Sequence, residues 1–243
     1  GAQGLFSVTR LAFLWHIPLM SALSSPSELL DFWFGGAWGT EQMKEANPNA
    51  ENQLPLWFGW RPKDQRMNTP EEQAALDEAC RSKFGELVRA CGRGDLDESE
   101  DWKTPDGLYA KMILTDQIPR NSFRGSQEAF AYDEIALGCV RKIYEDGIYK
   151  DYEVGHFWFI FQPPSHSENV ADHEMNLAIL TYAEEKFGVG NVGVKAALLS
   201  HKQVIDRFGR YPHRNKTLGR ESTPEEEAWL ADVDNVPGWA KRG

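Results

Sequence analysis

Apolar residues recur at helical spacing along most of the chain, and capped starts divide the chain into segments. Ser25-Pro26-Ser27-Glu28 matches a capping box with proline in the first helical position, and Gly35-Gly36 ends that segment. Similar starts occur at Thr69-Pro70-Glu71-Glu72, Thr104-Pro105-Asp106 and Thr223-Pro224-Glu225-Glu226. The pattern therefore predicts a protein built mainly from helices.

We predict helices over residues 26–34, 70–91, 105–118, 126–146, 157–161, 168–187 and 191–208, and a short one from 224. The run Phe157–Phe161 is the most strand-like, but its helical neighbours and a following proline pair favour a buried helix. Residues 35–69 are rich in Gly, Pro and Asn and are predicted to form an irregular loop that Trp57, Phe58 and Trp60 hold on the core.

Successive helices with short connections favour an all-α fold of stacked antiparallel helix hairpins, although no fixed-period repeat identifies a regular solenoid. The apolar segment Leu11–Met20 is too short to span a bilayer, and Pro18 interrupts it. We therefore predict that residues 1–24 form an N-terminal arm and residues 25–243 a helical domain. The arm would pack on the core, dock on a partner or associate peripherally with a membrane.

Composition excludes several functional classes. The net charge of −11 over 243 residues argues against nonspecific nucleic-acid binding, which needs Lys and Arg to neutralise phosphates. Three cysteines without a CxxC motif predict neither a disulfide framework nor a thiolate metal site. No cofactor is predicted, because the chain has no Walker A motif and its glycine-rich run at 188–193 follows a helix. Gly1 suggests a processed start, and we expect a soluble protein of the cytoplasm or an organelle.

Two arginine-rich segments, Leu114–Gly125 and His201–Asn215, stand out in this acidic chain. Each runs from a predicted helix into a stretch broken by Pro and Gly, where a scaffold can fix polar side chains. If the segments face each other, they would line one pocket for an acidic peptide or a small anion, because the Arg fork suits carboxylate and phosphate. The candidate ligand-binding residues are Asp116, Arg120, Asn121, Arg124, His166, Glu168, Arg207, Arg210, His213, Arg214, Asn215 and Arg220.

The alternative for these arginines is structural, because pairing with Asp116, Glu168 or Asp206 would fix the loops between helices. Catalytic constellations are weak. His166 or His213 could move protons on a bound anion. No HExxH motif occurs, and six residues separate His166 from His173, so no metal site is predicted. A GxSxG elbow is also lacking.

Five segments resemble, in order, the motifs of one family: Leu30–Gly35, Asp116–Gly125, Pro164–Glu168, Arg207–Asn215 and Leu218–Glu226. On these motifs the chain is similar to the DUF924 family, a bacterial-type domain of unknown function found also in some eukaryotes. The resemblance covers roughly residues 28–232 and implies an all-helical fold similar to tetratricopeptide-repeat proteins. Ser165 departs from the family pattern, which usually has Glu there, and so puts in doubt any site that needs this carboxylate.

Two functions follow as hypotheses. The first is a non-catalytic binding or assembly module, an accessory subunit of a larger complex with a protein partner and an Arg-rich pocket for an acidic peptide or small anion. The second is a hydrolase-like enzyme acting on a small phosphorylated or carboxylated substrate. They differ in whether the arginine and histidine side chains converge on an open cleft or are consumed in closed ion pairs.

Overall fold

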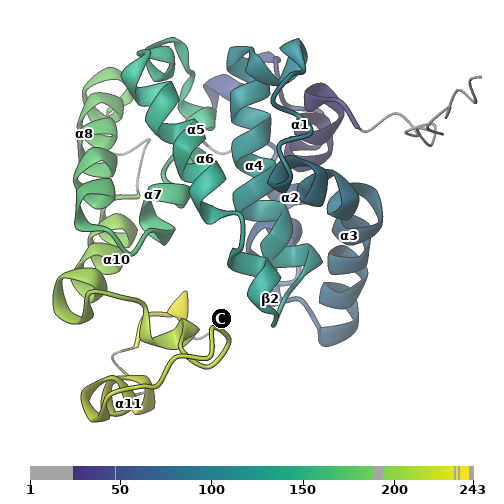
Figure 1. Cartoon of the computed structure of the whole chain (residues 1–243). Helices are drawn as coiled ribbons and strands as arrows, with labels where there is room; N and C mark the ends of the chain where they lie inside the picture. The colour runs from purple at the N-terminus through teal and green to yellow at the C-terminus, as the bar shows by residue number, and fades with distance from the viewer. Residues whose placement is uncertain (1–23, 47, 189–193, 233, 235, 241–243) are drawn as a thin grey trace, which may run out of the picture.

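The computed structural model describes residues 24–46, 48–188, 194–232, 234 and 236–240 (Figure 1). Its α-helices are α1 (Pro26–Phe34), α2 (Ala50–Phe58), α3 (Pro70–Gly92), α4 (Pro105–Ser122), α5 (Asp133–Glu145), α6 (Phe157–Ile160), α7 (Gln162–His166), α8 (Val170–Phe187), α10 (Lys195–Phe208) and α11 (Pro224–Ala231). Short 3-10 turns lie at η1 (Glu41–Lys44), η2 (Glu100–Lys103), η3 (Gln127–Phe130), η4 (Ile148–Asp151), η5 (Val154–His156) and η6 (Pro212–Arg214). The antiparallel hairpin β1 (Trp60–Arg61) and β2 (Arg66–Met67) pairs Trp60 with Met67 and Arg61 with Arg66.

The all-α prediction is confirmed, whereas stacking of the tetratricopeptide-repeat kind stays a prediction. The capped starts explain much of this agreement. The side chains of Ser25, Thr69 and Thr223 each accept a hydrogen bond from the backbone N–H at N3, and the carboxylate of the N3 glutamate accepts one from the backbone N–H of the cap residue. Thr104 caps α4 by accepting from the Gly107 N–H at 3.0 Å.

The prediction that residues 35–69 are irregular is wrong, because this segment contains η1, α2 and the hairpin. Long-range contacts that composition does not reveal hold α2 in place. Asn49, at φ +51°, donates to the carbonyl oxygens of Phe34 and Gly35 at 3.2 and 3.0 Å. The Trp57 indole is buried and donates to the Trp33 carbonyl oxygen at 2.8 Å, so this predicted anchor is confirmed. Trp60, by contrast, is 37% exposed.

Several helix ends also differ from the predictions. Helix α4 continues through Pro119 to Ser122, where the Phe123 N–H still reaches the Pro119 carbonyl oxygen at 2.9 Å. The predicted helix 126–146 is divided into η3 and α5. The buried helix predicted at 157–161 is present as α6. The predicted arm lies outside the described residues, apart from residue 24, and so does most of the glycine-rich run at 188–193.

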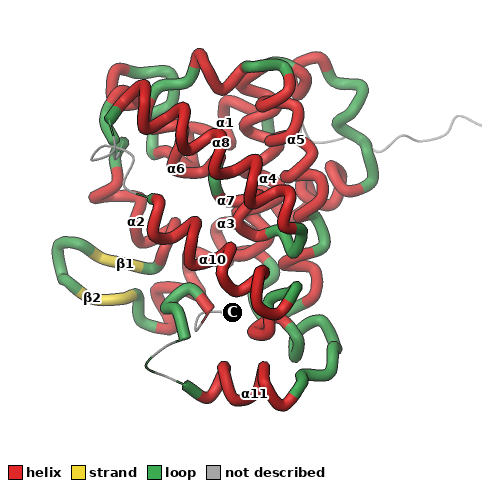
Figure 2. The backbone as a smooth tube through the Cα atoms, turned by 90° about the vertical axis from the view of Figure 1, so that its left-hand side faces the viewer, coloured by secondary structure: helices red, strands yellow, loops and turns green. Residues whose placement is uncertain are grey.

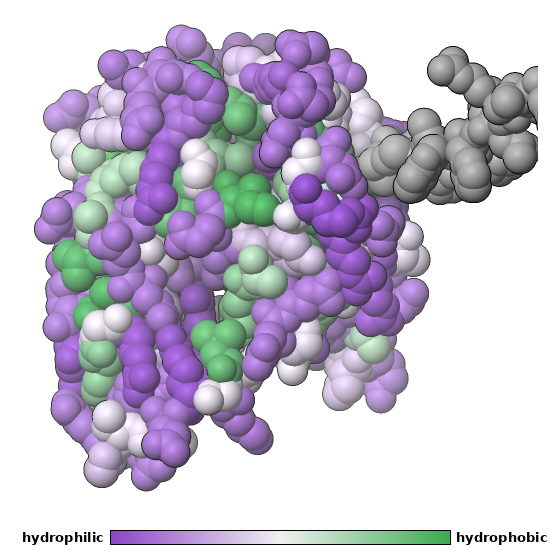
Figure 3. Space-filling view, in the orientation of Figure 1, coloured by the Kyte–Doolittle hydropathy of each residue, from purple (hydrophilic) through white to green (hydrophobic). Residues whose placement is uncertain are grey.

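Helix α4 lies at the centre of the bundle in Figure 1 and packs against α1, α3 and α5. Nearly all of its residues from Gly107 to Ser122 are buried, including polar ones. Gly107 permits close approach of η2, because a Cβ there would lie 2.1 Å from the Asp101 carbonyl oxygen. Around α4 the core is rich in aromatic rings such as Trp33, Phe34 and Phe159. Hydrophilic residues cover most of the face drawn in Figure 3.

A smaller apolar cluster holds the C-terminal part of the chain. Val204, Ile205 and Tyr211 are buried there, with Trp229 and Trp239 packed against them. Figures 1 and 2 both place α11 below α10, away from the main bundle. No helix in the described ranges is long and apolar enough to cross a membrane. Side chains from the C-terminal part and from α4 line one pocket.

Candidate functional site

A pocket of about 690 Å³ lies over the C-terminal half of α4. Its floor is one face of that helix, where Gln117, Arg120 and Asn121 lie at spacings that bring them together. Arg124, just past the end of α4, extends this floor. The walls come from the α2–hairpin region, from α6 and α7, from α10, and from η6 with the C-terminal segment. The residues that those elements contribute include Trp57, Phe58, Met67, Asn68, Trp158, Gln162, His166, His201, Tyr211, His213, Arg214 and Trp239. The two arginine-rich segments therefore do meet.

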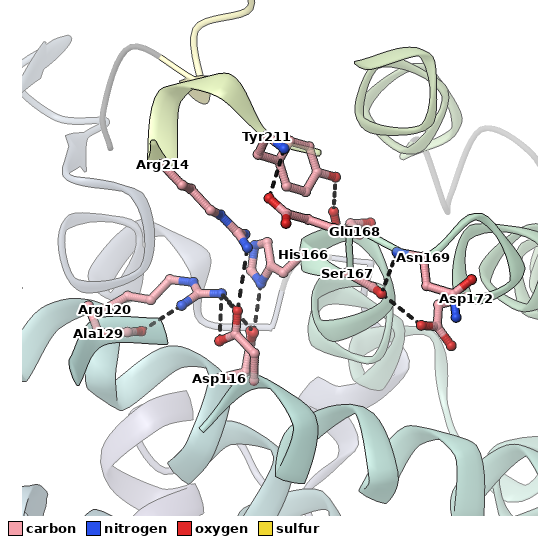
Figure 4. Close-up of polar contacts among 12 residues, drawn as sticks. Asp116, Arg120, Ala129, His166, Ser167, Glu168, Asn169, Asp172, Tyr211 and Arg214 are labelled. Carbon is pink, nitrogen blue, oxygen red and sulfur yellow. Dashed lines mark hydrogen bonds and ion pairs between the residues drawn. The ribbon is translucent and has the colours of Figure 1, made fainter. Parts of the chain in front are cut away.

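Asp116 and His166 form a buried pair at the base of this pocket (Figure 4). His166 Nδ1 lies 2.6 Å from Asp116 Oδ1, and the carboxylate is 1% exposed. Burial raises the pKa of Asp116, but its interactions with His166 and Arg120 outweigh this effect and hold the pKa at about 2. Because the carboxylate is ionised, it can only accept, and His166 must carry its proton on Nδ1.

That tautomer leaves His166 Nε2 with a free lone pair. Among the described residues, none donates to or accepts from Nε2. Burial lowers the pKa of His166, and Asp116, which raises it, does not compensate, so the imidazole is neutral at neutral pH. The pocket therefore has a hydrogen-bond acceptor at this position, oriented by a buried carboxylate.

Arg120 and Arg214 lie beside this pair but differ in how well they are bound. Arg120 donates to the Ala129 carbonyl oxygen at 2.7 Å and to both oxygens of Asp133 at 3.0 Å. Arg214 reaches down from η6 in Figure 4, and its nearest carboxylate oxygen, Asp133 Oδ2, is 3.6 Å from Nη1. This distance is too long for a hydrogen bond.

The Arg214 side chain makes no hydrogen bond to any described residue, although the residue is only 7% exposed. Its Nε is fully buried without a partner. The guanidinium stacks over Phe130 and Tyr211, with its carbon 5.0 and 4.7 Å from the two ring centroids. Burial, followed by the charge of Arg120, lowers the pKa of Arg214. Arg214 is thus a buried cation with unmet donors at the pocket wall.

His213 and His201 complete the wall near Arg214. His213 Nδ1 is buried without a partner in the described chain, and burial lowers the pKa of His213 to about 3. His201 donates to or accepts from no carboxylate that is described; its Nδ1 lies 2.8 Å from the Ala197 carbonyl oxygen. Its ring stacks on Trp239 with centroids 3.9 Å apart. Both rings are therefore neutral surfaces at neutral pH.

Other predicted site residues are placed outside the pocket lining: Glu168, Arg207, Arg210, Asn215 and Arg220. Most of them form ion pairs within the protein, as expected if these arginines are structural residues. Some of the carboxylate partners differ from those predicted. Arg220 donates to Glu168 at 2.7 and 3.0 Å, and Glu168 also accepts the Tyr211 N–H at 2.8 Å.

Arg210 donates to Glu226 at 2.6 and 2.8 Å, and Asn215 donates to the same carboxylate at 3.2 Å. Arg207 lies 2.9 Å from Glu225. Asp206, named as an arginine partner, pairs with Lys202 instead. These contacts stabilise the C-terminal part of the chain. Arg214 takes part in none of them and is the buried cation that this part contributes to the pocket.

Arg124 and Asn121 line the pocket but are partly engaged. Arg124 donates to both oxygens of Asp77 at 2.8 and 3.1 Å, and to Asn121 Oδ1 at 2.8 Å. Asp116 lies beneath the lining rather than in it. Ser165, which departs from the family pattern, is buried and donates to the Phe161 carbonyl oxygen at 2.7 Å. It thus has a structural hydrogen bond.

Sequence reasoning did not select several lining residues: Gln117, Trp158, Gln162, Tyr211 and Trp239. Gln117 and Tyr211 stand inside the two arginine-rich segments and could have been found there. Trp158, Gln162 and His166 are spaced by four, which places them on one helical face. Within the described residues, no three His, Cys, Asp or Glu side chains are grouped so that they could hold a metal ion.

Comparisons with known proteins give a family and a similar structure. A family model described as a bacterial protein of unknown function, DUF924, matches residues 29–234. A solved structure of a protein of unknown function from Agrobacterium tumefaciens has a TM-score of 0.62 and 26% sequence identity to this chain. That match covers 85% of this chain and 97% of the other. No curated protein matches the sequence.

Proposed function

The chain belongs to the DUF924 family, and we propose that it is a binding module whose pocket takes an organic carboxylate or phosphate anion. One observation carries this proposal. Arg214 is 7% exposed, lines the pocket and makes no side-chain hydrogen bond to any described residue. Burying a charged group without hydrogen bonds is costly, by several kcal/mol in typical proteins, so a partner is expected at this guanidinium.

An anion would supply that partner. A carboxylate or phosphate oxygen can accept from the Arg214 donors that face the pocket, and charge-assisted bonds of this kind are the stronger ones. A phosphate monoanion, which keeps one proton, could also donate to His166 Nε2, which has a lone pair directed by Asp116. Arg120 adds positive charge nearby while its own donors are already satisfied. The same chemistry would suit the acidic end of a protein partner, as in an accessory subunit built on stacked helix hairpins.

The test is calorimetric titration of the full chain with acetate and with inorganic phosphate at pH 7 and low ionic strength. We expect saturable binding at one site, weakened by added salt because the contact is charge-assisted. The arginine at position 210 provides a matched control, since Arg210 is bound to Glu226 and lies outside the pocket. Binding that Arg210→Met removes, or no heat with either anion, would contradict the proposal.

A second candidate function is a hydrolase acting on such an anion. The Asp116–His166 pair favours it, because an imidazole oriented by a buried carboxylate can take a proton from water through Nε2. The water oxygen would then attack a carbonyl or phosphoryl centre, and Arg214 would stabilise the charge that develops on the substrate oxygen. The ester bond to the leaving alcohol would break, and the His166 imidazolium would return the proton to the departing oxygen. His213 is the weaker choice of base, because no described carboxylate orients it and its pKa is about 3.

Turnover of p-nitrophenyl acetate and p-nitrophenyl phosphate tests this candidate. We expect His166→Gln to reduce the rate of whichever ester is cleaved by roughly 100-fold or more, in line with the loss of a general base. His213→Gln is the matched control and should retain most of the rate. Equal rates for the wild type and His166→Gln would leave the protein as a binding module only.

A further inference from the structure

We infer that the ligand is an elongated organic anion, with its charged end at Arg214 and His166 and an aromatic or aliphatic body that extends to Trp158. This inference rests on the proposed anion-binding function and adds the ligand class. It follows from the way that charge and apolar surface are separated along the pocket.

A single row of side chains connects the two ends. Trp158, Gln162 and His166 lie on successive turns of α6 and α7, and Gln162 Nε2 donates to the Trp158 carbonyl oxygen at 3.3 Å. All three line the pocket. At a rise of about 1.5 Å per residue, the eight steps along the helix from Trp158 to His166 span about 12 Å. Acetate or phosphate would occupy only one end of such a row.

The end at Trp158 is an apolar wall. The Trp158 ring lies 5.9 Å from that of Trp57 and 5.7 Å from that of Phe58, measured between centroids. Leu56 and Met67 line the pocket on the same side. Met67 is 47% exposed, so the protein leaves apolar surface open to solvent at this rim. Aromatic and aliphatic groups gain free energy by covering such a surface.

Charge at the pocket floor supports one anionic group rather than two. Arg124, at the end of the α4 row, already donates to both oxygens of Asp77. Arg120 is similarly bound to Asp133. Among the described lining arginines, Arg214 alone lacks a hydrogen bond. The volume of about 690 Å³ lies in the range that holds drug-sized ligands, about 300–1,000 Å³.

The experiment compares acetate, 4-phenylbutyrate and 4-phenylbutanol in calorimetric titrations of the full chain. We expect 4-phenylbutyrate to bind roughly 100-fold more tightly than acetate, because its apolar body is buried on the wall. The alcohol, which lacks the charge, should bind at least tenfold more weakly than 4-phenylbutyrate. The shared phenylalkyl body separates the contribution of the head group from that of the body.

Variants locate the body. Trp158→Leu should weaken 4-phenylbutyrate roughly tenfold and leave acetate unchanged, since the ring area and the indole hydrogen bond to the Ala46 carbonyl oxygen that it removes both lie at the far end from Arg214. If Trp158→Leu folds poorly, Met67→Ala replaces it, because Met67 lies at an exposed position. We expect Met67→Ala to weaken the binding of 4-phenylbutyrate by a smaller factor. Leu199→Ala is the matched control, because Leu199 is 37% exposed and does not line the pocket.

The outcomes separate the two proposals. Two outcomes overturn the inference on ligand class and leave the anion site standing. In one, acetate binds but the phenyl body adds no affinity. In the other, neither Trp158→Leu nor Met67→Ala changes the affinity for 4-phenylbutyrate. If the alcohol binds as tightly as the acid, the pocket is apolar and the anion site falls. If none of the three compounds binds, both proposals fall.

Discussion

Replacing Arg214 by methionine is expected to weaken anion binding at least 100-fold while the free energy of unfolding stays level or rises by about 1 kcal/mol. The reason is that Arg214 is buried yet makes no side-chain hydrogen bond to a described residue, so burying its charge costs more free energy than its contacts with the protein return. Methionine keeps much of the volume over Phe130 and Tyr211 without the charge. Site residues that destabilise the protein are a recognised cost of function.

Calorimetry and urea denaturation of the same samples measure both effects. Arg210→Met is the control, since Arg210 donates twice to Glu226 and once to the Glu221 carbonyl oxygen, and its removal leaves the Glu226 carboxylate without its cation. We expect that control to have a lower free energy of unfolding than the wild type and to keep anion binding. If Arg214→Met instead loses stability as Arg210→Met does and still binds the anion, Arg214 is a structural residue.

The contrast between Arg210 and Arg214 shows which features of the site could be predicted from the sequence. Both stand in the same motif, with the same composition around them, and both are predicted ligand-binding residues. Their roles depend on which carboxylate the fold brings near, and Glu226 comes from a helix capped at Thr223. Capping boxes are local patterns and could be predicted, whereas partners separated along the chain could not.

The Asp116–His166 pair makes the same point. Fifty residues separate the two side chains, and only the packing of α7 against α4 brings them to 2.6 Å. The sequence placed each residue in a candidate site but gave no reason to join them. The loop prediction over 35–69 failed for a related reason, because Asn49 and Trp57 stabilise α2 by contacts with α1 and the turn that ends it. Local spacing does predict the Trp158–Gln162–His166 row once a helix is assumed.

Acidification from pH 7 to pH 5 is expected to lower the free energy of unfolding by several kcal/mol. Every histidine of the described chain has a pKa below its ordinary value, with burial as the main cause: His156, His166, His173, His201 and His213. The pKa values of His156 and His201 are about 4 and about 3. At pH 5 these two imidazoles stay unprotonated in the folded chain, while the unfolded chain takes up protons.

The sign follows from proton linkage. A histidine with a lowered pKa stabilises the fold above the unfolded pKa of about 6.5, and this contribution is lost as the pH falls toward the folded value. Each one that remains neutral costs on the order of 1.4 kcal/mol per pH unit below about 6.5. The carboxylates act in a separate window. Asp116 and Glu226 have pKa values of about 2, so their contribution is lost only below about pH 4.

Urea denaturation at pH 7, 6 and 5 measures the slope of the free energy of unfolding against pH. His213→Gln should reduce that slope by the equivalent of close to one proton. A saturating anion should also reduce this slope. Negative charge beside His166 raises the pKa of that imidazole in the folded chain and so brings it closer to its pKa in the unfolded chain. Stability that does not change between pH 7 and pH 5 would mean that the buried histidines accept protons without unfolding. An anion that stabilises the protein equally at both pH values would place its charge away from His166.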